Sequence, residues 1–141
     1  MRPLLGIDLG EARTGIAISD ELRMLAHPLE TVATGSAVVQ RIGEIVSERN
    51  VDCVVVGLPR HMNGSFGGGA EKAREFAEKL RRALSCEVVT WDERLSTVAA
   101  HRALRESGKK MRQTRGIVDQ VAAQMILQGY LDRLNDGRAA F

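Results

Sequence analysis

The stretch LLGIDLGEARTGIAIS, residues 4–19, decides the fold that we expect for this chain. Two short apolar runs, Leu4–Leu9 and Gly15–Ser19, flank the polar turn GEART. Apolar runs of this length on either side of a turn are typical of a β-hairpin. Leu22–Val32, which follows, predicts a third strand that Pro28 interrupts. The chain therefore opens with an antiparallel meander.

The rest of the chain alternates between strand-like and helical patterns. Val51–Leu58, VDCVVVGL, is almost continuously apolar and β-branched, as in a strand buried on both faces, and Glu87–Trp91 predicts the next strand. Apolar residues recur at helical spacing in Ala37–Arg49, Ala70–Leu84, Ser96–Ser107 and Ile117–Leu134. We expect an α/β fold with one mixed sheet, an antiparallel meander plus parallel strands, and helices on both faces.

Size and composition indicate one domain over residues 1–141. A chain of 141 residues, 44% hydrophobic and 27% charged, is long enough for a real core, and its net charge of +2 is too small to indicate a nucleic-acid partner by itself. Cys53 and Cys86 lack zinc-ligand spacing and are expected to be free thiols. No apolar run approaches the roughly 20 residues of a membrane span. We expect a soluble cytoplasmic protein with no membrane partner.

Asp119 breaks the pattern of the last predicted helix. At about 100° per residue, Gln120, Gln124, Gln128 and Asp132 share a face that is expected to be wet. Asp119 lies instead on the apolar face, with Ala122, Ala123, Ile126, Tyr130 and Leu134. A bare carboxylate there would cost several kcal/mol unless it is protonated, paired or bound to a cation. The tail after this helix, Asn135–Phe141, is expected to fray.

Other acids stand where predicted strands end. Asp8 ends the first strand, and Asp92 and Glu93 end a parallel strand that could lie beside it. Function in such sheets gathers beyond the carboxyl ends of the parallel strands. Mg²⁺ and Mn²⁺ prefer hard oxygen ligands, and two such ions can clamp a phosphodiester. We therefore predict a catalytic divalent-metal site formed by Asp8, Glu93 and Asp119.

Each acid also has a structural interpretation. Asp8 could satisfy turn amides, and Asp92 or Glu93 could stabilise the start of the next helix. Asp119 could pair with Arg115 one turn earlier. Asp92 and Glu93 are neighbours on a strand and should point to opposite faces. Glu93 is therefore the preferred ligand, with Asp92 as a helper.

A basic stretch precedes the Asp119 helix. Residues 102–115 carry six cationic side chains against the one acid Glu106, the cations being Arg102, Arg105, Lys109, Lys110, Arg112 and Arg115. Cations beside an acidic centre suit an enzyme that holds a nucleic-acid backbone, although a solvated charged surface would look the same. Arg13, in the hairpin turn, and His61 and Asn63, in the glycine-rich loop Pro59–Gly69, are further candidates for contact with nucleic acid.

Four blocks of the sequence resemble one known family. GIDLGEARTGIAISD (residues 6–20), VVVGLPRHMNGSFGG (54–68), WDERLSTVAA (91–100) and VDQVAAQMILQGYL (118–131) resemble, in order, the motifs of the YqgF-type (RuvX) proteins. The second block departs from the family pattern, because His61-Met62-Asn63-Gly64 stands where Asn-Met-Asp-Gly is usual. The blocks are specific in combination, and each alone is weak.

The resemblance implies a ribonuclease-H-like fold related to Holliday-junction resolvases. It implies that Asp8, Glu93 and Asp119 correspond to the family's acidic ligands of Mg²⁺ or Mn²⁺. It also implies a nuclease that matures the precursor of small-subunit ribosomal RNA, on a structured RNA and with the small subunit as a further partner, or one that cuts branched DNA. The sequence leaves that choice open, together with the choice between a monomer and a weak homodimer.

Two other functions compete with the nuclease. DLGEARTG, residues 8–15, also resembles the first phosphate loop of sugar kinases and actin-like ATPases, which need two such domains and commonly more than twice this length. A non-catalytic RNA- or ribosome-binding protein on an inherited nuclease fold is the third hypothesis, against which the intact acids argue.

Overall fold

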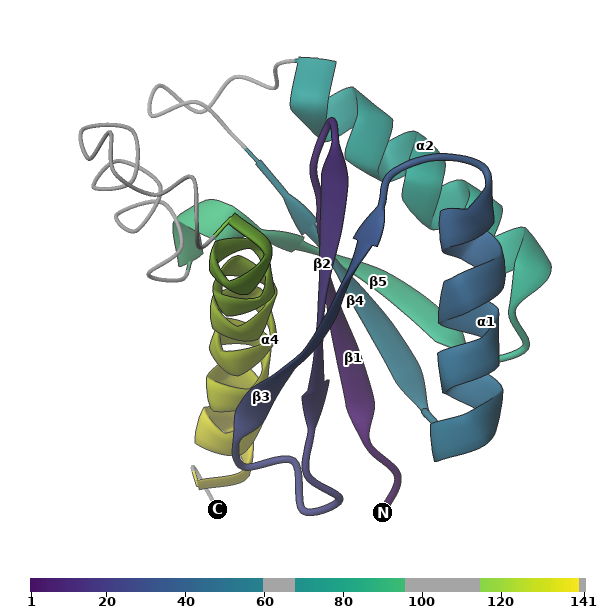
Figure 1. The fold of residues 1–141 in the computed structure, drawn as a ribbon. Coiled ribbons are helices and arrows are strands. Elements are labelled where there is room, and N and C mark those ends of the chain that lie inside the picture. Colours follow the sequence, from purple (N-terminus) through teal and green to yellow (C-terminus); the bar gives the residue numbers. More distant parts are fainter. Residues whose placement is uncertain (60–67, 96–114, 140–141) are drawn as a thin grey trace.

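The computed structural model describes residues 1–59, 68–95 and 115–139, with the backbone alone at 68, 115–118 and 137–139. A five-stranded sheet in the order β3-β2-β1-β4-β5 forms its centre (Figure 1). The strands are β1 (Leu4–Leu9), β2 (Arg13–Ser19), β3 (Ala26–Ala33), β4 (Cys53–Leu58) and β5 (Glu87–Asp92). β1 to β3 form an antiparallel meander, and β4 runs parallel to both β1 and β5. The mixed sheet predicted from the sequence is confirmed.

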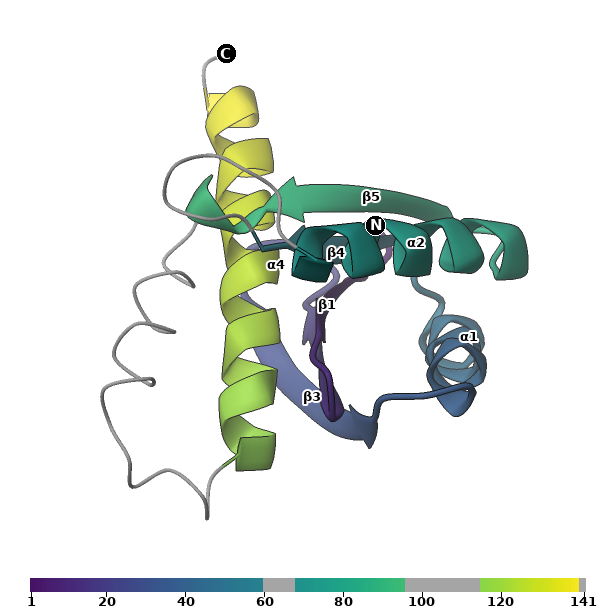
Figure 2. The same cartoon turned by 90° about the horizontal axis from the view of Figure 1, so that it is seen from above.

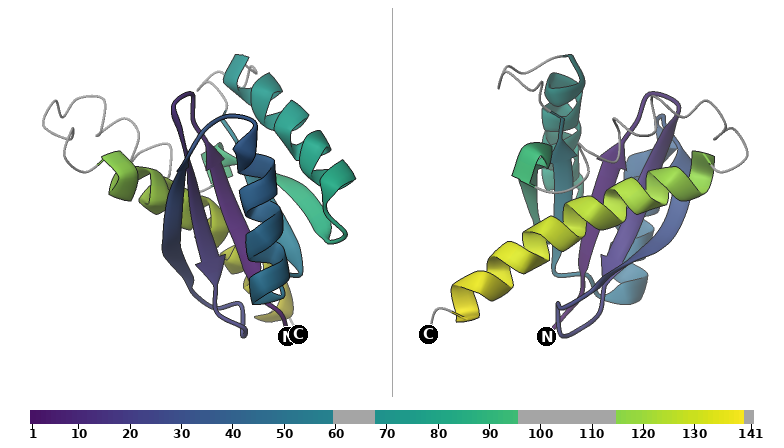
Figure 3. Two further views of the ribbon diagram at one scale, coloured as in Figure 1. Left: turned by 45° about the vertical axis from the view of Figure 1, so that its right-hand side comes forward. Right: turned by 90° about the vertical axis from the view of Figure 1, so that its left-hand side faces the viewer.

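Helices cover both faces of the sheet, as expected. Helices α1 (Ala37–Arg49) and α2 (Gly68–Ala83) lie on one face, and α4 (Arg115–Ala139) crosses the other (Figure 2). The short 3₁₀ helix η1 (Glu93–Leu95) follows β5 directly. Figure 3 shows α4 running obliquely across the meander. The helix predicted for residues 96–107 and most of the loops predicted around it and after β4 lie outside the described residues.

The position of Pro28 follows from the strand order. β3 is an edge strand, so a residue without an N–H group costs no hydrogen bond on the open side. Pro28 stands opposite Ala17, beside the point where the register of β2 and β3 shifts. The regular pairing of β3 is therefore interrupted beside the proline, and the strand continues to Ala33.

Two boundaries differ from those that the sequence patterns suggested. The third strand begins at Ala26, because the segment before it forms a turn in which an Asp20 carboxylate oxygen accepts the N–H groups of Met24 at 2.8 Å and Leu25 at 3.0 Å. The tail expected to fray is helical to Ala139. Asn135 contributes to that order, because its side-chain amide donates to the carbonyl of Arg23 at 3.0 Å.

Each face of the sheet has its own core. Leu5, Ile7 and Ile16 pack with α1 and α2, whereas Leu4 and Ala17 pack with α4. The side of α4 that faces the sheet contributes the buried residues Ala122, Ala123, Ile126, Leu127 and Leu131. Alternate residues of each inner strand thus serve opposite faces, which fixes the face on which any strand residue lies.

Cys53 and Cys86 are free thiols, as predicted. Burial raises the pKa of the Cys53 thiol to about 12, and burial also raises the pKa of Cys86. Among the described residues, no helix is both long enough and apolar enough to cross a membrane.

Candidate acidic site

Asp8 lies on the face of the sheet that α4 covers. It follows Leu4 and Gly6 at alternate positions of β1, and both contact α4 or its core. Asp8 is only 4% exposed, although it is charged. It stands opposite Gly15 of β2, and the pairing of Ile7 with Val56 places Gly57 of β4 on its other side. Asp8 is therefore flanked by glycines on both neighbouring strands.

Asp119 lies over the first of these glycines. A Cβ atom added to Gly15 would stand 2.0 Å from the Asp119 carbonyl oxygen, so the backbone of α4 comes close to β2 at a position that has no side chain. Asp119 is 6% exposed, which confirms that the apolar-face position is buried. Arg13 Nε donates to Asp119 Oδ2 at 2.9 Å.

Glu93 lies over the second glycine. A Cβ atom added to Gly57 would stand 3.0 Å from Glu93 Oε2, and Glu93 is 4% exposed. Adjacent strands are about 4.8 Å apart, so the Glu93 carboxylate lies roughly one strand spacing from the backbone of Asp8. Asp8, Glu93 and Asp119 thus come from a strand, a 3₁₀ helix and a long helix to one area of the sheet.

β5, the strand that ends just before Glu93, does not lie beside β1, contrary to the arrangement considered from the sequence. β4 lies between β1 and β5, and Gly57 of β4 leaves room for the Glu93 carboxylate. The Asp92 carboxylate forms hydrogen bonds with Arg94. Its Oδ1 accepts the backbone N–H of Arg94 at 2.9 Å, and its Oδ2 accepts from Arg94 Nη2 at 2.9 Å, which raises the pKa of Arg94.

The donor set suits a hard divalent cation. Among the described residues, no group of three or more His, Cys, Asp or Glu side chains is arranged to hold a metal ion as it stands. Mg²⁺, however, commonly takes one or two protein carboxylates and completes its shell with water and substrate phosphate. Buried carboxylates on separate rigid elements meet that requirement, and Arg13 neutralises one of them in this conformation.

The glutamine face of α4 is only partly wet: Asp132 is exposed, as its periodicity predicted, but the three glutamines are half-buried against β3. Gln120 donates to the Thr31 hydroxyl at 3.1 Å, and Gln124 donates to the Ala26 carbonyl at 2.9 Å. Gln128 accepts the Ala26 N–H at 2.9 Å. Helical periodicity identifies a polar face but does not say whether water or an edge strand satisfies it. Here Gln120, Gln124 and Gln128 each form a hydrogen bond with β3.

The glycines were missed as site residues. A glycine inside a strand pattern often marks a close approach of other backbone, and that signal stood at Gly15 and Gly57. Several predicted nucleic-acid contacts lie outside the described residues: His61, Asn63, Arg102, Arg105, Lys109, Lys110 and Arg112. Arg115 begins α4, and only its backbone is described.

Residues 2–133 match the profile of a family described as RuvX, Holliday junction resolvase. A Bacillus cereus protein named as a candidate pre-16S rRNA nuclease is 46% identical over 134 residues, covering 92% of this chain and 98% of the relative. A protein of the same name from Acetivibrio thermocellus is 48% identical over 133 residues, covering 92% of this chain and 94% of the relative. The similarity therefore extends over both chains almost in full.

Solved resolvase structures share the fold. RuvC of Thermus thermophilus in complex with a Holliday junction substrate gives a TM-score of 0.56 at 14% identity, covering 93% of this chain and 94% of RuvC. A further Thermus thermophilus RuvC structure gives a TM-score of 0.52 at 18% identity, covering 94% of this chain and 96% of that RuvC chain. At these identities the likeness concerns the fold, which is the ribonuclease-H-like architecture expected from the sequence.

Proposed function

The chain belongs to the RuvX family of nucleases, and from this premise we propose that it is a divalent-metal-dependent endonuclease that cuts a phosphodiester bond at Asp8, Glu93 and Asp119. The single observation that carries the proposal is the gathering of these buried carboxylates around Gly15 and Gly57 on one face of the sheet. Three buried acids within one small area repel one another, so the area favours a cation.

Each residue has a distinct part. Asp8, at the centre of the sheet, and Glu93, over β4, would hold the cation from rigid backbone. Asp119 would add a third oxygen from α4, with Arg13 orienting its carboxylate. When bound, Mg²⁺ or Mn²⁺ would supply an activated water and neutralise charge on the leaving oxygen. The Arg13 side chain is 34% exposed and contacts Asp119 through Nε, so its outer nitrogens would be the groups offered to a phosphate.

We assign the precursor of 16S ribosomal RNA as the substrate class. The relatives that match this chain at 46% and 48% identity bear that substrate in their names and align over nearly their whole length. The family description supports a four-way DNA junction as the second candidate. The proposal includes residues 1–141 as one nuclease domain in the cytoplasm, monomeric or weakly dimeric, with the small ribosomal subunit as a further partner. The basic stretch Arg102–Arg115 would hold the strand.

The test offers purified protein with Mn²⁺ a precursor 16S 5′ leader and, separately, a synthetic four-way junction. We expect the RNA to be cut and Asp8→Asn to lower the rate at least about 100-fold, because even outer-shell partners of ligands contribute 10- to 100-fold. Binding of the RNA by Asp8→Asn should persist in a gel-shift assay. Glu48→Gln, at an exposed position of α1, is the matched control.

Three results would revise the proposal. Full activity of Asp8→Asn would remove the metal centre from the mechanism. Cleavage of the junction alone would replace the substrate assignment with the resolvase alternative. Binding without cleavage of either nucleic acid, with Mg²⁺ and with Mn²⁺, would leave a non-catalytic RNA-binding protein.

A further inference from the structure

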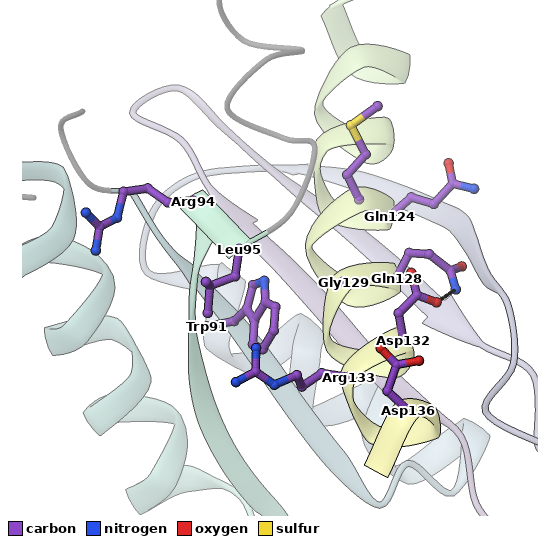
Figure 4. Close-up of a pocket in the computed structure, with 10 residues that line it drawn as sticks. Trp91, Arg94, Leu95, Gln124, Gln128, Gly129, Asp132, Arg133 and Asp136 are labelled. Atoms are coloured by element: carbon purple, nitrogen blue, oxygen red, sulfur yellow. Dashed lines mark hydrogen bonds between the residues drawn. The ribbon is translucent and has the colours of Figure 1, made fainter. Parts of the chain in front are cut away.

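A cavity of about 630 Å³ lies between the end of β5 with η1 and the C-terminal half of α4 (Figure 4). The residues that matter for its chemistry are Trp91, Leu95, Met125, Gly129, Asp132 and Arg133. The indole of Trp91 forms one wall, and Tyr130 packs edge-on against it with ring centroids 5.8 Å apart. Gly129, in the middle of α4, contributes no side chain, so the cavity stays open there.

The Trp91 indole carries an unusual polar group. Its Nε1–H is buried and has no hydrogen-bond partner among the described residues, and the side chain as a whole is 8% exposed. A buried donor without an acceptor costs about 1–3 kcal/mol, and native proteins keep few such groups. In Figure 4 the nitrogen edge of the ring lies beside Leu95, whose side chain is 55% exposed at the rim. The donor therefore lies beside an exposed side chain at the rim of the cavity.

The walls select a neutral ligand with acceptors on its edge. Among the described lining residues, the formal charges of Arg94 and Arg133 are matched by Asp132 and Asp136, and Arg94 is itself paired with Asp92. These residues therefore supply no excess of positive charge that would favour a bare phosphate. Trp91, Leu95 and Met125 supply apolar surface. The amide of Gln124 is already used by the Ala26 carbonyl. A flat apolar ring with carbonyl or ring-nitrogen acceptors on its edge, which is a nucleobase, fits this combination.

The cavity lies close to the acidic site, because its lining includes Arg94, the residue after Glu93 in η1. Trp91 lies two residues before Glu93 and belongs to the core that α4 covers, the face to which the Glu93 carboxylate also turns. Two residues of extended chain span roughly 6.6 Å. We propose that this cavity binds an unstacked base of the nucleic-acid strand, next to the phosphate at the acidic site. The assignment of a strand, as opposed to a free nucleotide, rests on the proposed function.

Trp91 is the chain's single tryptophan, so its fluorescence reports on this cavity alone. The probe is a single-stranded RNA oligonucleotide of about ten nucleotides, titrated in EDTA so that no cleavage intervenes. The matched control is an oligonucleotide of equal length and charge with abasic positions. We expect saturable quenching by the first and none by the second, with wild type and Glu48→Gln alike. Gly129→Leu, which places a side chain in the cavity, should abolish the quenching.

A second variant keeps the test independent of folding defects. Trp91→Phe retains an aromatic wall and removes the N–H donor, and we expect it to weaken binding of a dye-labelled oligonucleotide about tenfold by anisotropy. Unchanged affinity of Trp91→Phe, or equal quenching by the abasic strand, would overturn the base-binding assignment. Equal quenching by uridine or adenosine monophosphate at matched concentration would show that the cavity binds a free nucleotide, and it would refute the assignment to a strand.

The base-binding assignment and the nuclease assignment can be refuted separately. Base-dependent quenching by a protein that cuts no substrate would sustain the cavity and refute the proposed function. Cleavage by a protein whose fluorescence never responds to RNA would support the proposed function and refute the base-binding assignment. Quenching by short peptides and not by RNA would identify the cavity as a protein-binding site and refute the assignment to nucleic acid.

Discussion

At the scale of single residues, the acidic site depends on two positions that carry no side chain. Gly15 lets the backbone of α4 approach β2, since any Cβ there would lie 2.0 Å from the Asp119 carbonyl oxygen. That oxygen belongs to a helix backbone and cannot rotate away. Relief therefore requires a shift of α4, which would displace Asp119 and loosen the core beneath it.

We predict that Gly15→Ala lowers the free energy of unfolding by about 3 kcal/mol, the upper end of typical overpacking costs. Urea denaturation followed by circular dichroism measures this. Gly43→Ala is the matched control, because its added Cβ would meet only Leu84 Cδ2 at an ordinary 3.6 Å. Since Gly43 lies within α1, alanine there should stabilise the protein by about 0.5–1 kcal/mol. Equal effects of the two substitutions would contradict the close approach at Gly15.

Arg13 was expected to contact nucleic acid, and the structure shows it paired with Asp119. The 2.9 Å contact joins residues 106 positions apart, one on β2 and one on α4. Asp119 is almost fully buried, whereas the Arg13 side chain is 34% exposed. Removing the arginine leaves a buried carboxylate without this donor, and partial access of water moderates the cost.

A double-mutant cycle of Arg13→Ala and Asp119→Asn tests this pairing. We expect each single variant to be destabilised in metal-free buffer and the coupling free energy to be about 1–2 kcal/mol, as for partly exposed hydrogen-bonded charge pairs. Chemical denaturation of the four proteins gives the value. Strict additivity would mean that the pair contributes nothing to stability.

At the scale of elements, alternation along strands carried most of what the sequence could predict. It separated Asp92 from Glu93, because neighbours on a strand serve opposite faces, but it did not by itself say which of the two faces the site. It could not predict that β4 would lie between β1 and β5, because strand order depends on contacts between distant segments. Alternation and periodicity also could not predict that Gln124 would bind β3, since an edge strand can satisfy an amide as well as water does.

A bidentate ion pair between Arg41 and Glu30 joins α1 to β3 of the meander. Arg41 Nε donates to Glu30 Oε2 at 2.8 Å, and Nη2 donates to Oε1 at 2.8 Å. The Arg41 side chain lowers the pKa of Glu30 below its ordinary 4.5. A carboxyl whose pKa is depressed on folding stabilises the protein above its unfolded pKa. That contribution is lost as the pH falls through the folded value.

We therefore predict that Glu30→Gln lowers the melting temperature by a few degrees at pH 7 and that the difference disappears well below pH 4. Both groups are partly exposed, and the effect should also shrink in 1 M NaCl. Calorimetry of both proteins from pH 2.5 to pH 7 tests the expectation. Glu48→Gln, on the same helix, is the control that should change little at any pH. A constant difference down to pH 2.5 would exclude the carboxylate as its source.

At the scale of the whole molecule, the acidic site joins segments that meet only in the folded chain. Asp8 lies on the first strand, Glu93 follows the last strand, and Asp119 lies on the C-terminal helix. The sequence located these acids by their surroundings: an apolar helix face and the ends of predicted strands. It could not supply their distances, which depend on Gly15 and Gly57 and on the height of α4.

Because no single segment contains the site, an ion bound there would hold β1, η1 and α4 together and would bind the folded chain far better than the unfolded one. A ligand at 100 times its dissociation constant adds about 2.7 kcal/mol, or roughly 6–10 °C in melting temperature for a chain of this size. We predict a rise of that order with saturating Mn²⁺ for wild type and almost none for Asp8→Asn.

Differential scanning calorimetry with and without Mn²⁺ measures the rise independently of any cleavage. The melting temperature of Asp8→Asn without metal should equal or exceed that of wild type, because the substitution removes one of three neighbouring buried negative charges. Glu48→Gln should keep the full response to Mn²⁺. A rise of equal size in Asp8→Asn would place the ion elsewhere, and the acids would then serve the fold alone, with Arg13 compensating Asp119.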